Sequence, residues 1–302
     1  MTDFRPNHVL IPLDGSHEAE VVLGCCSTLA RAGATAFHLL AVVEPLDDEE
    51  MSDEGLRQAH LNGRMSLESY LIEKAARLRE SLGIEVRPQL RTGVPPAEIL
   101  NAADELAIDL VALATHGRTG LDRWRLGSVA DRVLRSATRP TLLIGPNVML
   151  PGDNVGVQRI SVPLDGSKLA EQAVAPAASL ARSLGASLEL VTVPTYRVPF
   201  GSDPYLSLNF RSIIARLEGR ARDYLENIQV GDLEDVTRIT LTHAASGDVG
   251  TLLNRHFSDL TEGLVVMTSH GRTGMTRWAL GSVAEEVIRG PAPVLILRGA
   301  MT

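Results

Sequence analysis

The chain has few aromatic residues, two cysteines and no excess of positive charge. Aromatics make up 4% of its 302 residues, and its formal net charge is −8. Phosphate backbones attract basic surfaces, so this balance argues against a nucleic-acid partner. No apolar run approaches the roughly 20 residues of a membrane-spanning helix, and residues 1–5 lack the basic and apolar regions of a signal peptide. We therefore expect a cytoplasmic protein with no nucleic-acid and no membrane partner.

The two cysteines, Cys25 and Cys26, are neighbours in the chain. Adjacent cysteines are poorly placed for an ordinary disulfide and supply too few ligands for a zinc site. We interpret them as small apolar side chains of a helix in a reducing compartment. The sequence predicts no metal ligands.

A long internal repeat organises the chain. Pro12 to Ser16 recurs as Pro163 to Ser167, and 12 of the 15 positions from His116 to Ala130 match the segment that begins at His270. A repeat of about 150 residues is too long for a solenoid and indicates domain duplication. We predict two domains, residues 1–147 and 156–302, joined by a linker near 145–157.

Each copy alternates short apolar runs, typical of strands, with longer segments whose apolar residues have helical spacing. This order predicts a doubly wound α/β domain, a five-stranded and mainly parallel sheet with helices on both faces. The strands expected in the first copy are 8–13, 36–43, 84–91, 109–114 and 141–144. Those expected in the second copy are 159–164, 188–193, 237–242, 264–268 and 294–297. Helices are expected at 16–31, 56–82, 97–106 and 128–135, and the acidic segment 47–54 and the segment 194–208 are expected to be irregular.

The repeated motifs fall at the carboxyl ends of strands, where open α/β sheets bind ligands. Asp14 and Asp165 follow the first strands, and their carboxylates could accept hydrogen bonds from ribose hydroxyls or an adenine amine. Gly127 and Gly281 open helices whose free N–H groups suit a phosphate. Arg118 and Arg272 are candidate phosphate contacts.

The same residues can also be interpreted as parts of the fold that bind no ligand. The segments from Ser128 and from Ser282 both fit a capping box, and the aspartates could simply stabilise the next helix. His116 and His270 have no partner at a catalytic spacing, so a role in loop structure is expected. Trp124 and Trp278 are expected to pack the loop against the fold, with a lid over a ligand as the alternative.

Several catalytic signatures are absent. The sequence contains no G-x-x-x-x-G-K-[ST] loop, no G-x-G-x-x-G turn after a strand and no G-x-S-x-G elbow. Nothing in it assembles a nucleophile, a base and an oxyanion hole. We expect no catalytic residues.

The motifs together resemble the universal stress protein family over nearly the whole chain, twice. The residues that carry the resemblance are Pro12 to Ser16, Ala41 to Pro45, Gly93 to Ile99, Thr115 to Gly120 and Leu126 to Ala130, with their counterparts in the second copy. The resemblance implies the strand order 3-2-1-4-5, binding of ATP or AMP with or without Mg²⁺, and a homodimer of tandem chains.

The resemblance also implies a set of binding residues. Asp14 and Val42 would face the base, and glycines with Ser128 and Val129 would hold the phosphates. The nucleotide-binding candidates of the first copy are Pro12, Asp14, Val42, Ala114, Gly117, Arg118, Gly127, Ser128 and Val129. Those of the second copy are Pro163, Asp165, Val193, Thr268, Gly271, Arg272, Gly281, Ser282 and Val283.

Both copies depart from the family's G-x2-G-x9-G-[ST] pattern at its first glycine. That position holds Ala114 in the first copy and the β-branched, more obstructive Thr268 in the second. We therefore expect the first half to bind nucleotide better. The leading hypothesis is an ATP/AMP-binding stress-response protein that acts by binding, with at most slow ATP hydrolysis. The alternatives are a nucleotide-independent scaffold whose halves form a partner surface, and an ATPase or nucleotide-dependent transferase.

Overall fold

A computed structural model describes the chain at residues 4–116, 126–148, 156–196, 204–241, 244–245, 249–258, 262–268 and 280–298. Contacts between Cα atoms divide it into two compact units. The first half is Arg5–Pro146. The second begins at Asn147 and also takes in Phe4, whose N–H donates a hydrogen bond to Ser179 Oγ at 3.1 Å.

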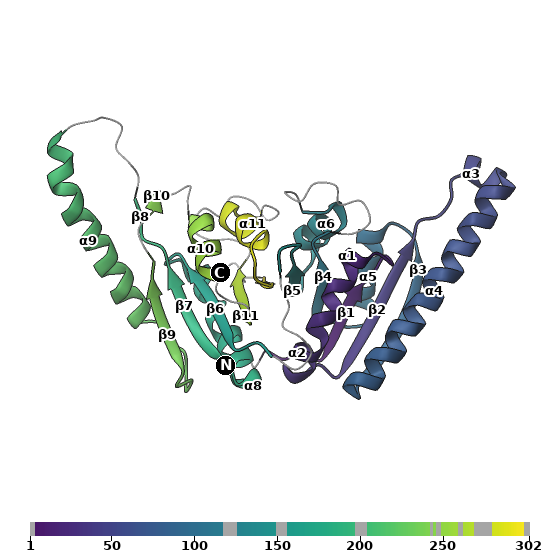
Figure 1. Cartoon of the computed structure of the whole chain (residues 1–302), viewed down its shortest axis with the longest axis horizontal. Helices are drawn as coiled ribbons and strands as arrows, with labels where there is room; N and C mark the ends of the chain where they lie inside the picture. Colours follow the sequence, from purple (N-terminus) through teal and green to yellow (C-terminus); the bar gives the residue numbers. More distant parts are fainter. Residues whose placement is uncertain are drawn as a thin grey trace. The chain divides into compact units, whose positions relative to one another are not determined.

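The first half is a five-stranded parallel sheet in the order β3-β2-β1-β4-β5 (Figure 1). Its strands are β1 (His8–Pro12), β2 (Ala36–Val43), β3 (Glu85–Thr92), β4 (Leu110–Ala114) and β5 (Thr141–Ile144). Its helices are α1 (His17–Glu20), η1 (Val21–Cys25), α2 (Cys26–Arg31), α3 (Asp48–Ser52), α4 (Glu54–Leu82), α5 (Pro95–Glu105) and α6 (Ser128–Ser136). The predicted strand order 3-2-1-4-5 is confirmed.

The second half repeats that order, with β9-β7-β6-β11-β12 in the places of strands 3-2-1-4-5. Its strands are β6 (Arg159–Leu164), β7 (Ser187–Thr192), β9 (Val236–Thr240), β11 (Gly263–Thr268) and β12 (Val294–Leu297), with a separate parallel pair, β8 (Thr195–Tyr196) and β10 (Ala244–Ala245). Its helices are α7 (Lys168–Glu171), α8 (Val174–Leu184), α9 (Pro204–Glu226), α10 (Val249–Phe257) and α11 (Ser282–Ile288).

Both faces of each sheet are covered. Val9, Leu10 and Ile11 are successive residues of β1 and all are fully buried, although neighbouring side chains of a strand point to opposite faces. Such continuous apolar runs are typical of parallel strands packed between helices. In the first half α4 packs on β2 and β3, and α5 packs on α6 (Figure 1).

Three segments differ from the sequence-based expectation. The segment 194–208, expected to be irregular, contains the strand β8, which pairs with β10, and the start of α9 at Pro204. The first helix is not continuous, because a 3-10 stretch, η1, separates α1 from α2. Val21, Val22 and Gly24 in this stretch are weak helix formers. The acidic segment contains the helix α3, which a capping box stabilises: Glu50 N–H donates to Asp47 Oδ1 at 2.8 Å and Asp47 N–H to Glu50 Oε2 at 3.0 Å.

In these described ranges, no helix is both long enough and apolar enough to cross a membrane.

Candidate functional site

A cavity of about 860 Å³ opens in the first half at the carboxyl ends of β1, β2 and β4. Strand β1 pairs with β2 on one side and with β4 on the other, so the cavity lies where the strand order reverses. The volume is within the roughly 300–1,000 Å³ of small-molecule sites. Seven sequence-predicted residues line it: Pro12, Asp14, Val42, Ala114, Gly127, Ser128 and Val129.

Four predicted candidates, Gly117, Arg118, Gly271 and Arg272, lie outside the described residues, as do the two tryptophans and His270.

The Asp14 wall of the cavity is fixed by a tight turn after β1. Gly15 has φ 81°, a conformation that favours glycine. Asp14 Oδ1 accepts hydrogen bonds from the N–H (2.9 Å) and the hydroxyl (2.5 Å) of Ser16, and Ser16 Oγ caps α1 by accepting from Ala19 N–H at 3.1 Å. The carboxylate therefore supports the helix start and also lines the cavity.

The opposite wall is the first turn of α6. Its N-cap is Gly127, and within the described part of the chain no side chain caps this turn. The predicted capping box at Ser128 is therefore wrong, because Ser128 is the first helical residue. The same holds at Gly281 and Ser282 in the second half. Unpaired N–H groups and the positive end of the helix dipole make the start of α6 suitable for an anion.

Gly127 brings α6 close to the end of β4. Its N–H donates to Thr115 O at 2.8 Å, and a Cβ at Gly127 would lie 2.9 Å from the same carbonyl oxygen. Thr115 N–H in turn donates to Ile144 O on β5 at 2.9 Å. His116 also lines the cavity, and its Nδ1 lies 2.9 Å from Thr115 Oγ1, a contact suited to the structural role expected for it.

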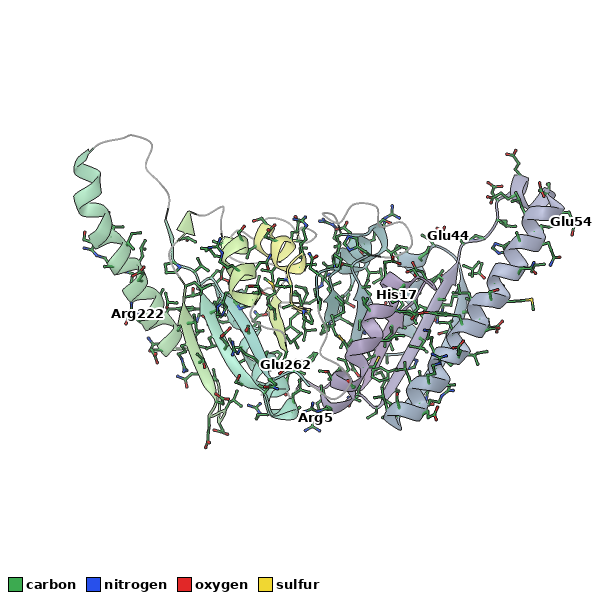
Figure 2. All side chains as sticks on the ribbon, viewed as in Figure 1. Arg5, His17, Glu44, Glu54, Arg222 and Glu262 are labelled. Carbon is green, nitrogen blue, oxygen red and sulfur yellow. The ribbon has the colours of Figure 1, made fainter. Side chains whose placement is uncertain are left out.

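Helix α4 supplies a third wall, which sequence reasoning missed. The residues involved recur at intervals of three or four along one face of the helix: His60, Gly63, Arg64, Leu67 and Tyr70. Glu44, labelled at the end of β2 in Figure 2, and Arg132 of α6 were also missed. The helical spacing was visible in the sequence, but nothing in it indicated which face of α4 meets the sheet edge.

Charged groups behind Tyr70 hold this wall together. Lys74 Nζ lies 2.7 Å from Glu20 Oε2 and 5.4 Å from the centre of the Tyr70 ring. Burial opposes ionisation of Glu20, but hydrogen bonds from Lys74 and Tyr70 and the charges of Lys74 and His17 together keep its pKa below the usual value. Burial raises the pKa of Tyr70, and the Glu20 and Asp14 carboxylates raise it further, so the phenol stays neutral.

The second half places its candidates at the corresponding strand ends. Asp165 follows β6 and accepts a hydrogen bond from Ser167 N–H at 2.9 Å, as Asp14 does from Ser16. The other candidates are Pro163 on β6, Val193 after β7, the buried Thr268 at the end of β11, and Gly281, Ser282 and Val283 at the start of α11.

The first-half cavity thus combines a carboxylate acceptor at one wall with backbone donors and cationic side chains at others. This arrangement suits a ligand with hydrogen-bond donors at one end and negative charge at the other. Among the described residues, no group of three or more His, Cys, Asp or Glu side chains is placed to hold a metal ion.

Known proteins resemble the chain in sequence. It is 25% identical over 150 residues to a universal stress protein of Methanocaldococcus jannaschii, a match that covers 45% of this chain and 93% of the relative. It is 29% identical over 150 residues to the universal stress protein YxiE of Bacillus subtilis, covering 46% and 98%. A second M. jannaschii universal stress protein is 37% identical over 73 residues, but the match spans only 43% of that relative and 24% of this chain.

A solved universal stress protein of Archaeoglobus fulgidus superposes with a TM-score of 0.66 at 19% identity, covering 98% of both chains. At this identity the likeness supports the fold alone. The sequence model of the Universal stress protein family matches residues 6–145 and again residues 156–298. The chain therefore belongs to the Universal stress protein family and carries two of its domains in tandem.

Proposed function

We propose that the first half binds an adenine nucleotide, ATP or AMP, and that the chain acts in the stress response through this binding rather than through fast catalysis. The observation that carries the proposal is the cavity, because Asp14 and the uncapped start of α6 both line it. A ribose or adenine donor suits the carboxylate, and phosphate suits the N–H groups of the helix. Val42 and Leu40 add apolar surface for a base.

Bound nucleotide is the first thing to measure. The full-length protein is purified and denatured, and the released small molecules are separated by chromatography. We expect ATP or AMP in a fixed ratio to the chain. If none is carried over, titration with ATP and Mg²⁺ by calorimetry replaces the extraction, since a ligand that binds the native state also raises the unfolding temperature.

Asp14→Asn is expected to lower the affinity for ATP about tenfold or more, because a hydrogen bond to a charged acceptor becomes a neutral one. Asparagine keeps an acceptor for Ser16, so the turn after β1 is preserved. Asp165→Asn is the matched control in the second half and should leave the first-half affinity unchanged. Calorimetric titration of both variants and of the wild type makes the comparison.

Two results would contradict the proposal: equal ATP affinity in Asp14→Asn and the wild type, or no heat and no thermal shift at millimolar ATP. The second would favour a nucleotide-independent scaffold.

Self-association into a homodimer of tandem chains, which the family resemblance implies, belongs to the same proposal. Light scattering behind size exclusion is expected to give twice the chain mass of 32.5 kDa. A mass equal to a single chain at micromolar concentration would contradict it.

A further inference from the structure

Two arginines of the first-half cavity have acidic counterparts in the second half. Arg132 and Glu286 occupy the same position of α6 and α11, since the ungapped match that includes Ser128 and Ser282 continues through them. Arg132 is one turn beyond Ser128, so both lie on the same face of α6, and both line the cavity. The positive group thus stands beside the anion-binding end of the helix.

Arg64 and Glu218 correspond in the same way. Tyr70 lies near Asp14 and Glu20, and Tyr224 lies near the matching pair Asp165 and Glu171. Burial raises the pKa of each tyrosine, and its two carboxylates raise it further. The two tyrosines are therefore equivalent, and six residues before them stand Arg64 on α4 and Glu218 on α9.

The contacts of the first-half arginines suit ligand binding. Arg64 lines the cavity and donates through Nη1 to Thr92 Oγ1 at 2.8 Å, which fixes its head at the end of β3. Arg132 is exposed and has its side chain at the cavity mouth. Guanidinium groups are the side chains best matched to phosphate oxygens.

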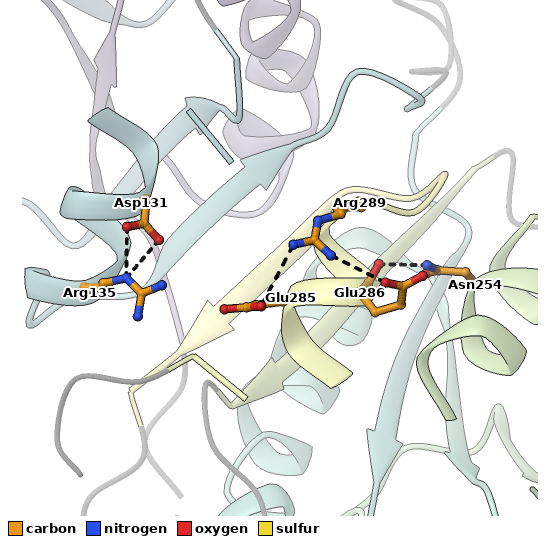
Figure 3. Close-up of polar contacts among 6 residues, drawn as sticks. All are labelled: Asp131, Arg135, Asn254, Glu285, Glu286 and Arg289. Carbon is orange, nitrogen blue, oxygen red and sulfur yellow. Dashed lines mark hydrogen bonds and ion pairs between the residues drawn. The ribbon is translucent and has the colours of Figure 1, made fainter. Parts of the chain in front are cut away.

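Glu286 is held differently. Gly250 is the second residue of α10, as Pro96 is of α5, and a Cβ at Gly250 would lie 2.5 Å from Glu286 Cβ, so the glutamate stem packs against α10. Arg289 Nη1 lies 3.5 Å from Glu286 Oε2, and Asn254 Nδ2 donates to Glu286 O at 2.7 Å (Figure 3). The neighbouring position keeps its ion pair in both halves, Asp131 with Arg135 and Glu285 with Arg289 (Figure 3). Between α6 and α11, the reversal of charge is therefore confined to the position of Arg132 and Glu286.

We propose that Arg64 and Arg132 form a phosphate clamp that makes the first half selective for nucleoside polyphosphates. The second half, with Glu218 and Glu286 at the corresponding positions, binds no nucleoside polyphosphate. This inference rests on the proposed nucleotide site and adds its phosphate selectivity and a stoichiometry of one. Each exchange of arginine for glutamate changes the formal charge by two units, which disfavours a polyanion most strongly where water is partly excluded.

The test is calorimetric titration of the full-length chain with ATP, AMP and adenosine. The wild type should bind one ATP per chain, more tightly than AMP. Arg132→Glu and Arg64→Glu should each weaken ATP binding about 10- to 100-fold, as expected for a lost charge-assisted hydrogen bond, and leave adenosine binding within about twofold. Arg77→Glu is the matched control, because it makes the same change of charge on an exposed part of α4, about 20 Å along the helix from Arg64. It should bind ATP as the wild type does.

Two ATP per chain, or the same ATP-to-adenosine affinity ratio in the wild type and both variants, would overturn the clamp while leaving nucleotide binding intact. A wild type that binds none of the three ligands would instead overturn the proposed function, and the clamp with it. Unfolding curves of the variants that match the wild type exclude misfolding as the cause of lost binding.

Discussion

Glu189→Ala is expected to destabilise the second half by about 3–5 kcal/mol, the cost of removing one partner from a buried charged network. Glu189 is 2% exposed on β7. Its Oε2 accepts from the buried Ser161 hydroxyl at 2.7 Å and lies 2.9 Å from His256 Nε2 on α10, and Arg159 Nη1 lies 3.6 Å from Oε1. Alanine would leave three polar groups without their acceptor, together with a cavity the size of the lost side chain.

Urea unfolding followed by circular dichroism, with hydrogen exchange to locate the loss in β6 and β7, measures this effect. Glu189→Gln keeps a hydrogen-bond acceptor and the side-chain volume, so it should lose less stability than Glu189→Ala. Glu234→Ala removes an exposed glutamate from the same half and should stay within about 0.5 kcal/mol of the wild type. A stability of Glu189→Ala equal to that of this control would show that the network contributes nothing.

The same network makes the second half acid-sensitive. Burial alone would raise the pKa of Glu189, but hydrogen bonds from His256 and Ser161 and the charges of His256 and Arg159 hold it below its ordinary value of 4.5. A carboxyl group whose pKa is lower in the folded state contributes stability above its unfolded pKa and loses it as pH falls through the folded one. The loss therefore begins near pH 4.5 and continues below it, and Glu189→Gln should remove this component from the pH profile.

The positions of this network show what the sequence could not predict. The apolar runs of the second half predicted β6 and β7 within one residue at each end. Nothing in those runs, however, indicates that Glu189 and Ser161 interact with His256. His256 is 67 residues further along the chain than Glu189, on a helix that only the crossover to β11 brings over the same sheet. Side-chain networks between crossover elements depend on tertiary packing, which periodicity does not encode.

Some residues of the candidate site were likewise predictable from the sequence, and others were not. Residues that follow strand ends, such as Asp14 and Gly127, were predictable because parallel strands carry their ligand sites at one edge. The wall formed by α4 was not, since its face toward the cavity depends on how a 29-residue helix crosses the sheet. Apolar and charged residues alternate all round α4, so no single stripe in the sequence marks its inner face. Arg64 and Tyr70 could be assigned only from the packed structure.

Gly127→Val is expected to weaken nucleotide binding by at least about 100-fold, a loss of about 2.7 kcal/mol. The backbone of Gly127 is at φ −59° and ψ 149°, a conformation open to any residue, so its importance is steric. A Cβ would lie 2.9 Å from Thr115 O, a backbone atom that is itself held in place by β5. Because neither segment can give way by a side-chain rotation, the start of α6 must move off the end of β4.

That displacement carries the N–H groups of the first turn, with Ser128 and Arg132, away from the cavity that they line. Hydrogen bonds to phosphate depend steeply on distance and angle, so a shift of a few tenths of an ångström at several donors together removes most of their contribution. Overpacking should also cost about 1–3 kcal/mol of stability, measured by thermal unfolding of the same samples.

Gly219→Ala is the matched control, because a Cβ there meets nothing within 4 Å in the middle of α9. It should bind ATP normally and unfold at or above the wild-type temperature. Wild-type ATP affinity in Gly127→Val would mean that the start of α6 does not contact the ligand, which would move the phosphate site elsewhere in the cavity.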